Sequence, residues 1–298
     1  MNVSRIGSSS LETPDVEALV AHYERVLGLV EVAREDGAVY LGTGRDLPSL
    51  RVRAGSRAHL ERVSLVLAPG SSVEEVVREL AGHGVTAAVS SDPEPGVVQA
   101  IDFDDPEGNG LRLVLAPDPA LAPNAPARGN GIAPHKLGHV ARRVQQPRTM
   151  ETFFGEVLGF RTSDWIGDLA LFMRCNADHH AMNFFRSAAD PGTVHHIAYQ
   201  LRDLQHLGDA CDLLRQEGIP VVWGPGRHGA GHNLFVYYHD ADGHLIELIA
   251  ELDTMLDEAL GYFDPRPWHV DVPQRPKTWP LEEPANRWGP PSPAWIRR

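Results

Sequence analysis

Short hydrophobic runs along the chain follow a pattern that occurs more than once. In residues 15–32, apolar side chains recur at the three- and four-residue spacing of an amphipathic helix, and a short strand follows. Residues 150–165 have the same helix-then-strand pattern. The ends of the two helices, VLGL at 26–29 and VLGF at 157–160, match at an offset of 131 positions. The glycine in each is suited to end a helix, because it tolerates the left-handed conformation.

A second unit also occurs twice. Strands with an alternating pattern are predicted at residues 60–67 and 194–201. Each is followed by an amphipathic helix, and then by a turn rich in Asp and Gly that leads into another strand. The helices are predicted over residues 71–85 and 204–219, and the turn-and-strand segments over 103–116 and 238–251.

These repeats divide the chain into four modules that pair into two halves, residues 1–116 and 136–252. Residues 117–135 are rich in Pro, Ala and Gly and are predicted to be a linker. Residues 253–298 form a tail rich in Pro and Trp, which we expect to wrap over the body because its tryptophans favour burial. The modules span roughly residues 4–56, 59–116, 136–187 and 193–252.

Composition narrows the classes of function. The formal net charge is −13 and no run of Lys or Arg stands out, so nucleic acid and anionic membranes are poor partners. The chain has no run of 18 apolar residues, and its first residues lack the apolar stretch of a secretory signal. The two cysteines, Cys175 and Cys211, are expected to be free thiols. We therefore expect a cytoplasmic protein without a transmembrane segment.

Residues 226–247, GRHGAGHNLFVYYHDADGHLIE, contain four histidines, two adjacent tyrosines and one glutamate. That glutamate, Glu247, lies within an apolar run that reads as a strand. Burying a carboxylate is costly unless a partner compensates its charge. The stretch therefore predicts that Glu247 faces a cation or a cluster of polar side chains.

The two halves differ at three matched strand positions. The C-terminal half has two imidazoles and a carboxylate where the N-terminal half has a hydroxyl and two guanidinium groups. The matched pairs are His139 with Ser8, His196 with Arg62, and Glu247 with Arg112. Arginine does not ligate metals, so a metal site is predicted in the C-terminal half only.

Two histidines and one carboxylate on neighbouring strands form a facial triad. Such a triad leaves open positions on one side of the metal, as non-haem Fe(II) oxygen chemistry requires. Mn(II) suits the same ligands, and Zn(II) with a bound water is the competing occupant.

The stretch that ends at Glu247 resembles the signature of type I extradiol, catechol 2,3-type, ring-cleavage dioxygenases of the vicinal oxygen chelate superfamily. The matching positions are GRH at 226–228, VY at 236–237, DADG at 240–243 and Glu247. Ala241 replaces the usual proline, a residue that only shapes the turn. GPGRHG and the tail pattern from Trp268 to Gln274-Arg275 are most similar to the homoprotocatechuate 2,3-dioxygenase branch.

The resemblance implies an α+β fold in which four βαβββ modules pair into two eight-stranded half-open barrels, the glyoxalase or vicinal oxygen chelate fold. The metal lies in the second barrel, the first barrel has no catalytic role, and the tail covers the active site. Homo-oligomerisation is also expected from the resemblance.

The same resemblance assigns roles to individual residues. His139, His196 and Glu247 are the metal ligands. His180 is the active-site acid/base that stabilises the oxygen species, with His179 the alternative for that position. His228 and Tyr237 are assigned to hydrogen-bond the substrate oxygens. His179, His195, His232, His239 and His244 are otherwise expected to be solvated or supporting residues.

The expected reaction is O2-dependent meta-cleavage of a catechol by Fe(II), with Mn(II) as the alternative metal. It gives a muconic semialdehyde-type product in the catabolism of aromatic hydrocarbons. Three basic or polar positions of the homoprotocatechuate branch are replaced here by Trp223, Ala141 and Pro276, whereas Arg275 remains. These differences favour an alkyl- or aryl-substituted catechol, with Trp223 and Arg275 as candidate pocket residues.

Two other functions fit parts of the same pattern. A glyoxalase-like isomerase or lyase of the same superfamily would use a metal, although such sites usually contain more carboxylate ligands. A non-enzymatic binding member of the superfamily would need no metal. Oxygen consumption with a catechol separates the dioxygenase from both.

Overall fold

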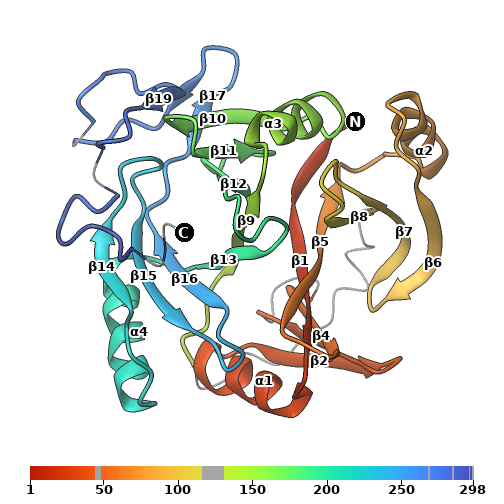
Figure 1. Cartoon of the computed structure of the whole chain (residues 1–298), viewed down its shortest axis with the longest axis horizontal. Coiled ribbons are helices and arrows are strands. Elements are labelled where there is room, and N and C mark those ends of the chain that lie inside the picture. The colour runs from red at the N-terminus through yellow and green to blue at the C-terminus, as the bar shows by residue number, and fades with distance from the viewer. Residues whose placement is uncertain (44–47, 116–130, 268, 284, 295, 297–298) are drawn as a thin grey trace.

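The computed structural model describes residues 1–43, 48–115, 131–267, 269–283, 285–294 and 296. Two strongly curved sheets stand side by side within these residues, one from each half of the chain (Figure 1). Most of the predicted linker, residues 117–135, lies outside the described residues. The predicted pairing of βαβββ modules into two half-open barrels is confirmed.

The N-terminal sheet has the strand order β2-β3-β4-β1-β5-β8-β7-β6. Helix α1 continues into a π-helical turn and ends at Gly28, whose φ of 71° is left-handed as predicted. The elements are β1 Val3–Thr13, α1 Val16–His22, β2 Val30–Glu35, β3 Ala38–Gly42, β4 Leu50–Ala54, β5 His59–Leu67, α2 Val73–Gly82, β6 Ala88–Glu94, β7 Val97–Asp104 and β8 Gly110–Val114.

The C-terminal sheet repeats this order as β14-β15-β16-β13-β9-β12-β11-β10 and adds a ninth strand, β19, at its edge. The ninth strand comes from the tail and pairs in parallel with β10. The elements are β9 Lys136–Val144, α3 Pro147–Glu156, β10 Arg161–Ile166, β11 Ala170–Arg174, β12 Met182–Arg186, β13 Val194–Gln200, α4 Leu204–Gln216, β14 Trp223–Arg227, β15 Leu234–His239, β16 Leu245–Ala250, β17 Met255–Asp257, β18 Tyr262–Phe263 and β19 Lys277–Trp279.

Three central strands of the C-terminal sheet set the positions of the predicted ligands. Ala198 on β13 pairs with His139 on β9 and also with Glu247 on β16. His196 is two residues before Ala198 on the same strand, so its side chain points to the same face of the sheet. The register therefore directs all three side chains into one half-barrel.

The two halves share one hydrophobic core, and buried polar contacts also join them. The Tyr23 hydroxyl donates to Oδ2 of Asp240 in the other half at 3.0 Å. Nη1 of Arg142 donates to Oδ1 of Asn109 at 3.3 Å. These contacts hold the N-terminal half as a packed scaffold beside the C-terminal half.

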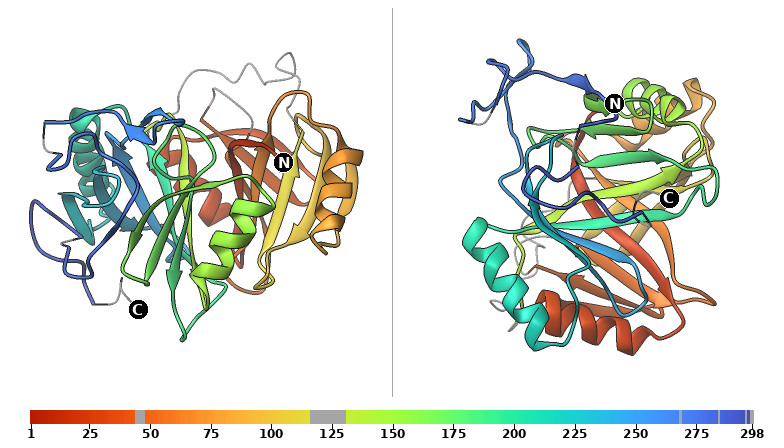
Figure 2. Two further views of the ribbon diagram at one scale, coloured as in Figure 1. Left: turned by 90° about the horizontal axis from the view of Figure 1, so that it is seen from above. Right: turned by 60° about the vertical axis from the view of Figure 1, so that its left-hand side comes forward.

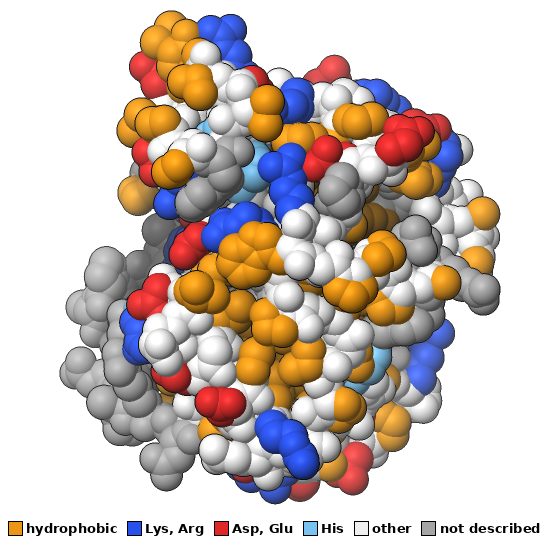
Figure 3. Space-filling model, turned by 90° about the vertical axis from the view of Figure 1, so that its left-hand side faces the viewer, with side chains coloured by type: hydrophobic (Ala, Val, Ile, Leu, Met, Phe, Trp, Pro, Cys, Tyr) orange, Lys and Arg blue, Asp and Glu red, His pale blue; other side chains and the backbone are white. Residues whose placement is uncertain are grey.

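The described part of the tail (residues 253–298) runs along the outer side of the C-terminal half (Figure 2). Trp279 is buried, but Trp288 is 53% exposed, so the expectation that the tail tryptophans are buried is wrong for Trp288. Trp268 and Trp295 lie outside the described residues. On the face that carries β14 and the tail, hydrophobic side chains gather centrally and Lys and Arg are scattered (Figure 3). None of the described helices is long and apolar enough to span a membrane.

Candidate metal centre

Two imidazoles and one carboxylate meet inside the C-terminal half-barrel. His139, His196 and Glu247 are each at most 3% exposed. Nε2 of His139 lies 2.9 Å from Nε2 of His196 and 3.0 Å from Oε2 of Glu247. Nε2 of His196 lies 3.3 Å from the same carboxylate oxygen. The structure thus brings together the three residues that the sequence predicted as metal ligands.

The separations between these atoms are those of three ligands that share one metal ion. Metal–ligand bonds of about 2.1 Å place neighbouring ligands about 3.0 Å apart in an octahedral site and about 3.4 Å apart in a tetrahedral one. The observed values of 2.9 and 3.0 Å match the octahedral spacing, whereas 3.3 Å lies nearer the tetrahedral spacing. Two imidazole nitrogens and a carboxylate oxygen are the donor set of facial-triad iron sites.

The electrostatics of the cluster match the needs of a divalent cation. Burial alone would raise the pKa of Glu247, but its side-chain contacts with His139, His196 and His228 hold that pKa well below its usual range. Burial lowers the pKa of His196 to about 4, although Glu247 opposes that shift. The carboxylate is therefore ionised and the imidazole neutral at pH 7, which are the states that bind metal.

Three further side chains with predicted roles lie beside the triad and line one cavity with it. Nε2 of His228 is 3.1 Å from Oε1 of Glu247 and 3.2 Å from the Tyr237 hydroxyl. The ring centroid of His180 is 4.3 Å from that of His139. Burial raises the pKa of Tyr237, and the charge of Glu247 raises it further, so this phenol keeps its proton at pH 7.

The tandem histidines that precede β12 separate into two environments. His180 is among the residues that line the cavity, whereas His179 lies behind it. Nε2 of His179 is 3.1 Å from Oδ2 of Asp164, and its Nδ1 is 2.9 Å from Nδ1 of His180. The geometry therefore favours His180, the sequence-based choice, as the active-site imidazole.

The cavity has a volume of about 530 Å³, within the range of about 300–1,000 Å³ typical of small-molecule sites. Its apolar wall includes Phe172 on β11, Phe185 on β12 and Trp223 on β14. The tail closes one side with Leu281 and Ile296. An apolar chamber with a few polar groups at one end is suited to a small aromatic molecule.

The basic side chains at the cavity have partners within the protein. Arg143 donates to the carbonyl of Val194 at 2.7 Å and lies 3.4 Å from Asp190. Arg186 donates to Asp168 at 2.7 Å. Both guanidinium groups are therefore already engaged by acceptors of the protein itself.

The two candidate pocket residues have different outcomes. Trp223 lines the cavity, and its ring stacks on Tyr237 with centroids 5.2 Å apart and an interplanar angle of 18°. Arg275 does not line the cavity, so its prediction as a pocket residue is wrong. Because the preceding Gln274 takes the buried position, the Arg275 guanidinium points to Tyr262, donating to its hydroxyl at 2.7 Å.

The matched positions of the N-terminal half form ion pairs. Asp102 pairs with Arg112 across β7 and β8, as Tyr237 pairs with Glu247 across β15 and β16. Arg112 donates to both carboxylate oxygens of Asp102, at 2.7 and 2.8 Å. Arg62 donates to the same carboxylate at 2.8 Å. Charge pairs thus replace the donor set of the C-terminal half.

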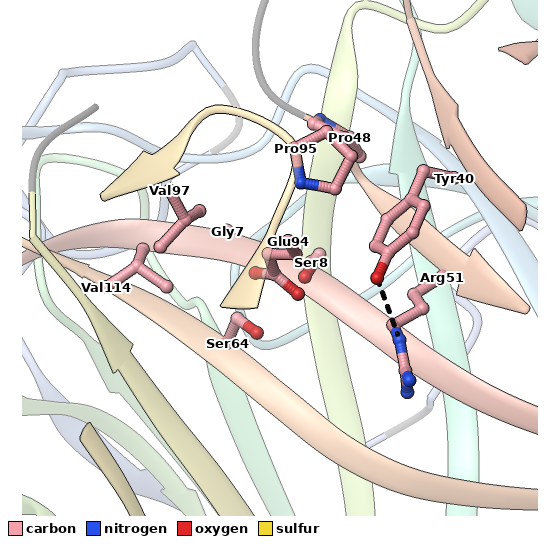
Figure 4. A pocket seen from close by; sticks show the side chains of 10 residues that line it. All are labelled: Gly7, Ser8, Tyr40, Pro48, Arg51, Ser64, Glu94, Pro95, Val97 and Val114. Carbon is pink, nitrogen blue, oxygen red and sulfur yellow. Dashed lines mark hydrogen bonds between the residues drawn. The ribbon is translucent and has the colours of Figure 1, made fainter. Parts of the chain in front are cut away.

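Little space remains beside these ion pairs. A cavity lined in part by Ser8, Ser64 and Glu94 has a volume of about 10 Å³ (Figure 4), which is room for about one water molecule. Ser8, which matches His139, therefore faces a packed interior. The side chains that could ligate a metal, His139, His196 and Glu247, lie in the C-terminal half.

Of the histidines that we expected to be solvated or supporting, four are buried and hold polar partners, as supporting residues do. His239 is partly exposed. Each of the four has a polar partner in the interior, which compensates the cost of burying its ring nitrogens. They are His179, His195, His232 and His244, at most 8% exposed.

A second group of buried ligand atoms, from His232, Asp253 and His269, lies away from the cavity wall. Nδ1 of His232 is 2.7 Å from Oδ2 of Asp253, and Nε2 of His269 is 3.4 Å from Oδ1. The backbone N–H of Arg266 donates to Nδ1 of His269, so the neutral ring carries its proton on Nε2 and points it at Asp253. His232 thus hydrogen-bonds to Asp253, whereas Nε2 of His269 and Oδ1 of Asp253 face each other without a hydrogen bond in the described structure.

Two polar residues of the cavity were missed from the sequence. Asn183 on β12 and Asn233 before β15 both line it and are 1% exposed. Nδ2 of Asn233 donates to Oε1 of Glu247 at 3.4 Å. Asparagines outside a recognised motif give no sequence signal for such positions.

Comparison with known proteins supports the architecture. The sequence model of the Glyoxalase/Bleomycin resistance protein/Dioxygenase superfamily matches residues 136–248. Metapyrocatechase 2 of Cupriavidus necator is 27% identical over 269 residues, 84% of this chain and 82% of that protein. The manganese-dependent 2,3-dihydroxybiphenyl 1,2-dioxygenase of Geobacillus genomosp. 3 is 26% identical, over 83% of this chain and 85% of that protein.

Among solved structures, the Mn(II)-bound glyoxalase from Novosphingobium aromaticivorans superposes with a TM-score of 0.81 at 24% identity. The match covers 99% of this chain and 94% of that chain. At this identity the likeness concerns the fold. The chain therefore has the vicinal oxygen chelate fold, and its residues 136–248 are a domain of the glyoxalase/bleomycin resistance protein/dioxygenase superfamily.

Proposed function

We propose that this protein is an extradiol dioxygenase that uses O2 to cleave a catechol ring beside its two hydroxyl groups. The product would be a muconic semialdehyde-type compound. The observation that carries the proposal is the buried triad of His139, His196 and Glu247 at one end of an apolar cavity. The similarity to a metapyrocatechase and to a dihydroxybiphenyl dioxygenase supports the same reaction class.

His139, His196 and Glu247 would hold one divalent ion through two imidazole nitrogens and a carboxylate oxygen. Such an ion, when bound, acidifies the catechol hydroxyls and mediates electron transfer between the ring and O2. Fe(II) is our proposed metal, because the triad is the donor set of Fe(II) oxygenases. Mn(II) is the alternative, and the manganese dependence of one relative supports keeping it.

His180, His228 and Tyr237 would handle protons and orient the substrate. Nδ1 of His180 faces His179, so Nε2 is the atom that exchanges a proton with the substrate. Burial lowers the pKa of His180, and neighbouring histidines lower it further, so the ring is neutral and ready to accept a proton. The Tyr237 hydroxyl and Nε2 of His228 are 3.2 Å apart and would hydrogen-bond a substrate oxygen together.

The cavity supports a substrate with an apolar substituent. Trp223 and Phe185 offer flat apolar surfaces, and Arg143 and Arg186 are engaged by aspartates. A carboxylated catechol would bury its charge without a dedicated partner, which is unfavourable. We therefore propose an alkyl- or aryl-substituted catechol, with Leu281 and Ile296 of the tail excluding water from the chamber.

The experiment is anaerobic loading with Fe(II) or Mn(II), followed by O2 uptake and product absorbance on a catechol panel. The panel contains catechol, 4-methylcatechol, 2,3-dihydroxybiphenyl and homoprotocatechuate. The proposal predicts equimolar O2 uptake, with kcat/KM at least about tenfold higher for the apolar compounds than for the carboxylated one. No O2 uptake with any catechol by the metal-loaded protein would refute it.

The same experiment separates the other functions. A glyoxalase-like isomerase or lyase would convert its substrate without consuming O2, and a binding member would retain its ligand without metal. The cytoplasmic location and the homo-oligomeric state remain predictions from the sequence.

A further inference from the structure

The tail contacts three histidine systems of the proposed active site. We propose that the C-terminal tail fixes which ring nitrogen carries the proton in His196 and His180, so that each presents an unprotonated Nε2 to the site. His195 and His179 pass this constraint to the following histidine as positioning residues. The catalytic meaning of these proton positions rests on the proposed function, whereas the contacts that fix them do not.

The first contact sets the proton of a proposed metal ligand. Nε2 of His195 is 2.8 Å from the backbone carbonyl of Ile296, which can only accept, so this nitrogen carries the proton. Nδ1 of His195 is then a lone pair, and it lies 2.7 Å from Nδ1 of His196. His196 must therefore donate from Nδ1, which leaves its Nε2 free to bind metal.

The second contact fixes the proton position of His180, the proposed acid/base, in the same way. Oδ2 of Asp164 accepts from Nε1 of Trp279 at 2.6 Å, and its Oδ1 accepts from the backbone N–H of Lys277 at 2.9 Å. Both oxygens of Asp164 thus act as acceptors, and Oδ2 lies 3.1 Å from Nε2 of His179, so the proton of His179 resides on Nε2. Nδ1 of His179 then accepts from Nδ1 of His180, which leaves Nε2 of His180 unprotonated.

The third contact is direct. Nδ1 of His228 is 2.6 Å from the carbonyl of Ala285, so Nδ1 is the donor. This contact orients the ring, whose Nε2 lies 3.1 Å from Oε1 of Glu247 and 3.2 Å from the Tyr237 hydroxyl. Three tail segments, at 277–279, 285 and 296, thus act on three different imidazoles.

These proton positions are well determined because the rings have little access to water. His179, His180, His195 and His196 are at most 6% exposed, so water does not compete with these contacts for the ring nitrogens. In each pair, the opposite tautomer would place two lone pairs or two protons against each other at under 3 Å. Outer partners of this kind typically affect metal affinity about 10- to 100-fold.

The affinity of the protein for Mn(II) tests the role of His195 without a measurement of catalytic turnover. In His195→Asn the side-chain oxygen takes the place of Nδ1 and keeps an acceptor, whereas His195→Leu fills similar space without one. We expect the Mn(II) dissociation constant to rise about 10- to 100-fold in His195→Leu and to stay within about threefold of wild type in His195→Asn. The matched control is His83→Leu, at an exposed position after α2.

Equal weakening in both His195 variants would show that the ring acts through packing, and unchanged affinity in His195→Leu would show that it does not act at all. Either result overturns the proposal. If wild-type protein binds no Mn(II) or Fe(II), the proposed function fails instead, and proton positions are then decided by spectroscopy.

That spectroscopic measurement is 15N–1H correlation of 15N-histidine-labelled, metal-free full-length protein, which distinguishes the two neutral tautomers. We expect Nε2–H forms for His179 and His195, and Nδ1–H forms for His180 and His196. Nε2–H forms at His180 and His196 would overturn the proposal even if no variant folds.

Discussion

Oε2 of Glu247 lies 3.0 Å from Nε2 of His139, and both side chains are 1% exposed. An ionised carboxylate at such depth needs a positive partner, because isolated buried charges are strongly unfavourable. His139 and His196 lie where they could bind a divalent cation together with Glu247. Four predictions about this site and one about the scaffold follow from the geometry.

Glu247→Gln should abolish tight metal binding while the fold survives, because Gln fills the same space without the charge. We expect the Mn(II) or Fe(II) dissociation constant to rise by at least about 100-fold, at the upper end of ligand-sphere effects. The measurement is metal content after dialysis, together with circular dichroism. A variant that folds and retains one equivalent of metal would contradict the ligand assignment.

Metal should also stabilise the native protein, since the triad is assembled only in the folded chain. At a free metal concentration 100 times the dissociation constant, the expected gain is about 2.7 kcal/mol in the free energy of unfolding. The measurement is thermal unfolding with and without Mn(II), in wild type and in Glu247→Gln. An equal rise of Tm in both proteins would mean that the ion acts elsewhere.

Tyr237→Phe should lower kcat by roughly 100-fold, because the hydroxyl 3.2 Å from His228 would no longer donate to the substrate. The matched control is Tyr238→Phe, the next residue on β15, whose buried hydroxyl has no hydrogen-bond partner in the described structure. Steady-state O2 uptake on the best catechol measures both. Similar activities for the two variants would remove Tyr237 from the mechanism.

Trp223→Arg should shift the preference of the cavity toward a carboxylated catechol, because it introduces a cation into a wall that now offers an indole. We expect the ratio of kcat/KM for homoprotocatechuate to that for 4-methylcatechol to rise at least about tenfold, which is about 1.4 kcal/mol of selectivity. The control is Val98→Arg, at an exposed position of β7. An unchanged ratio in Trp223→Arg would place the substituent elsewhere.

His244 should give the scaffold a pH-dependent contribution to stability. Burial alone would lower the pKa of His244, but the hydrogen bond and charge of Asp240 raise it above the usual 6.5. A folded-state pKa above the unfolded one means that the contribution is full below pH 6.5 and is lost as the pH rises through the folded pKa. The difference in unfolding free energy between wild type and His244→Gln should therefore shrink from pH 6 to pH 9, and urea titrations at several pH values measure it. A difference that widens with pH would reverse the assigned sign.

The internal repeat explains why the ligands were predictable. His139, His196 and Glu247 occupy strand positions that the N-terminal half fills with Ser8, Arg62 and Arg112, and sheet register then brings such positions together. Tyr237 and His228 follow from local spacing on and before β15. The positions of these side chains depend on the residues close to each of them in the chain, and such local patterns can be recognised in a sequence.

Contacts made by the tail were less accessible to prediction. The carbonyls of Ala285 and Ile296 hold active-site imidazoles, and any residue type has a carbonyl. Arg275 matched a motif, yet the turn that buries Gln274 directs its side chain away from the cavity. The ninth strand, Lys277–Trp279, likewise depends on an edge of β10 that is far away in sequence.

Anomalous diffraction from a crystal of Mn(II)-loaded protein measures the position of the ion directly. Our account predicts a single strong peak bounded by Nε2 of His139, Nε2 of His196 and a carboxylate oxygen of Glu247, with none in the N-terminal half-barrel. A peak between His232, Asp253 and His269, or among residues 1–115, with these three side chains unbound, would contradict it.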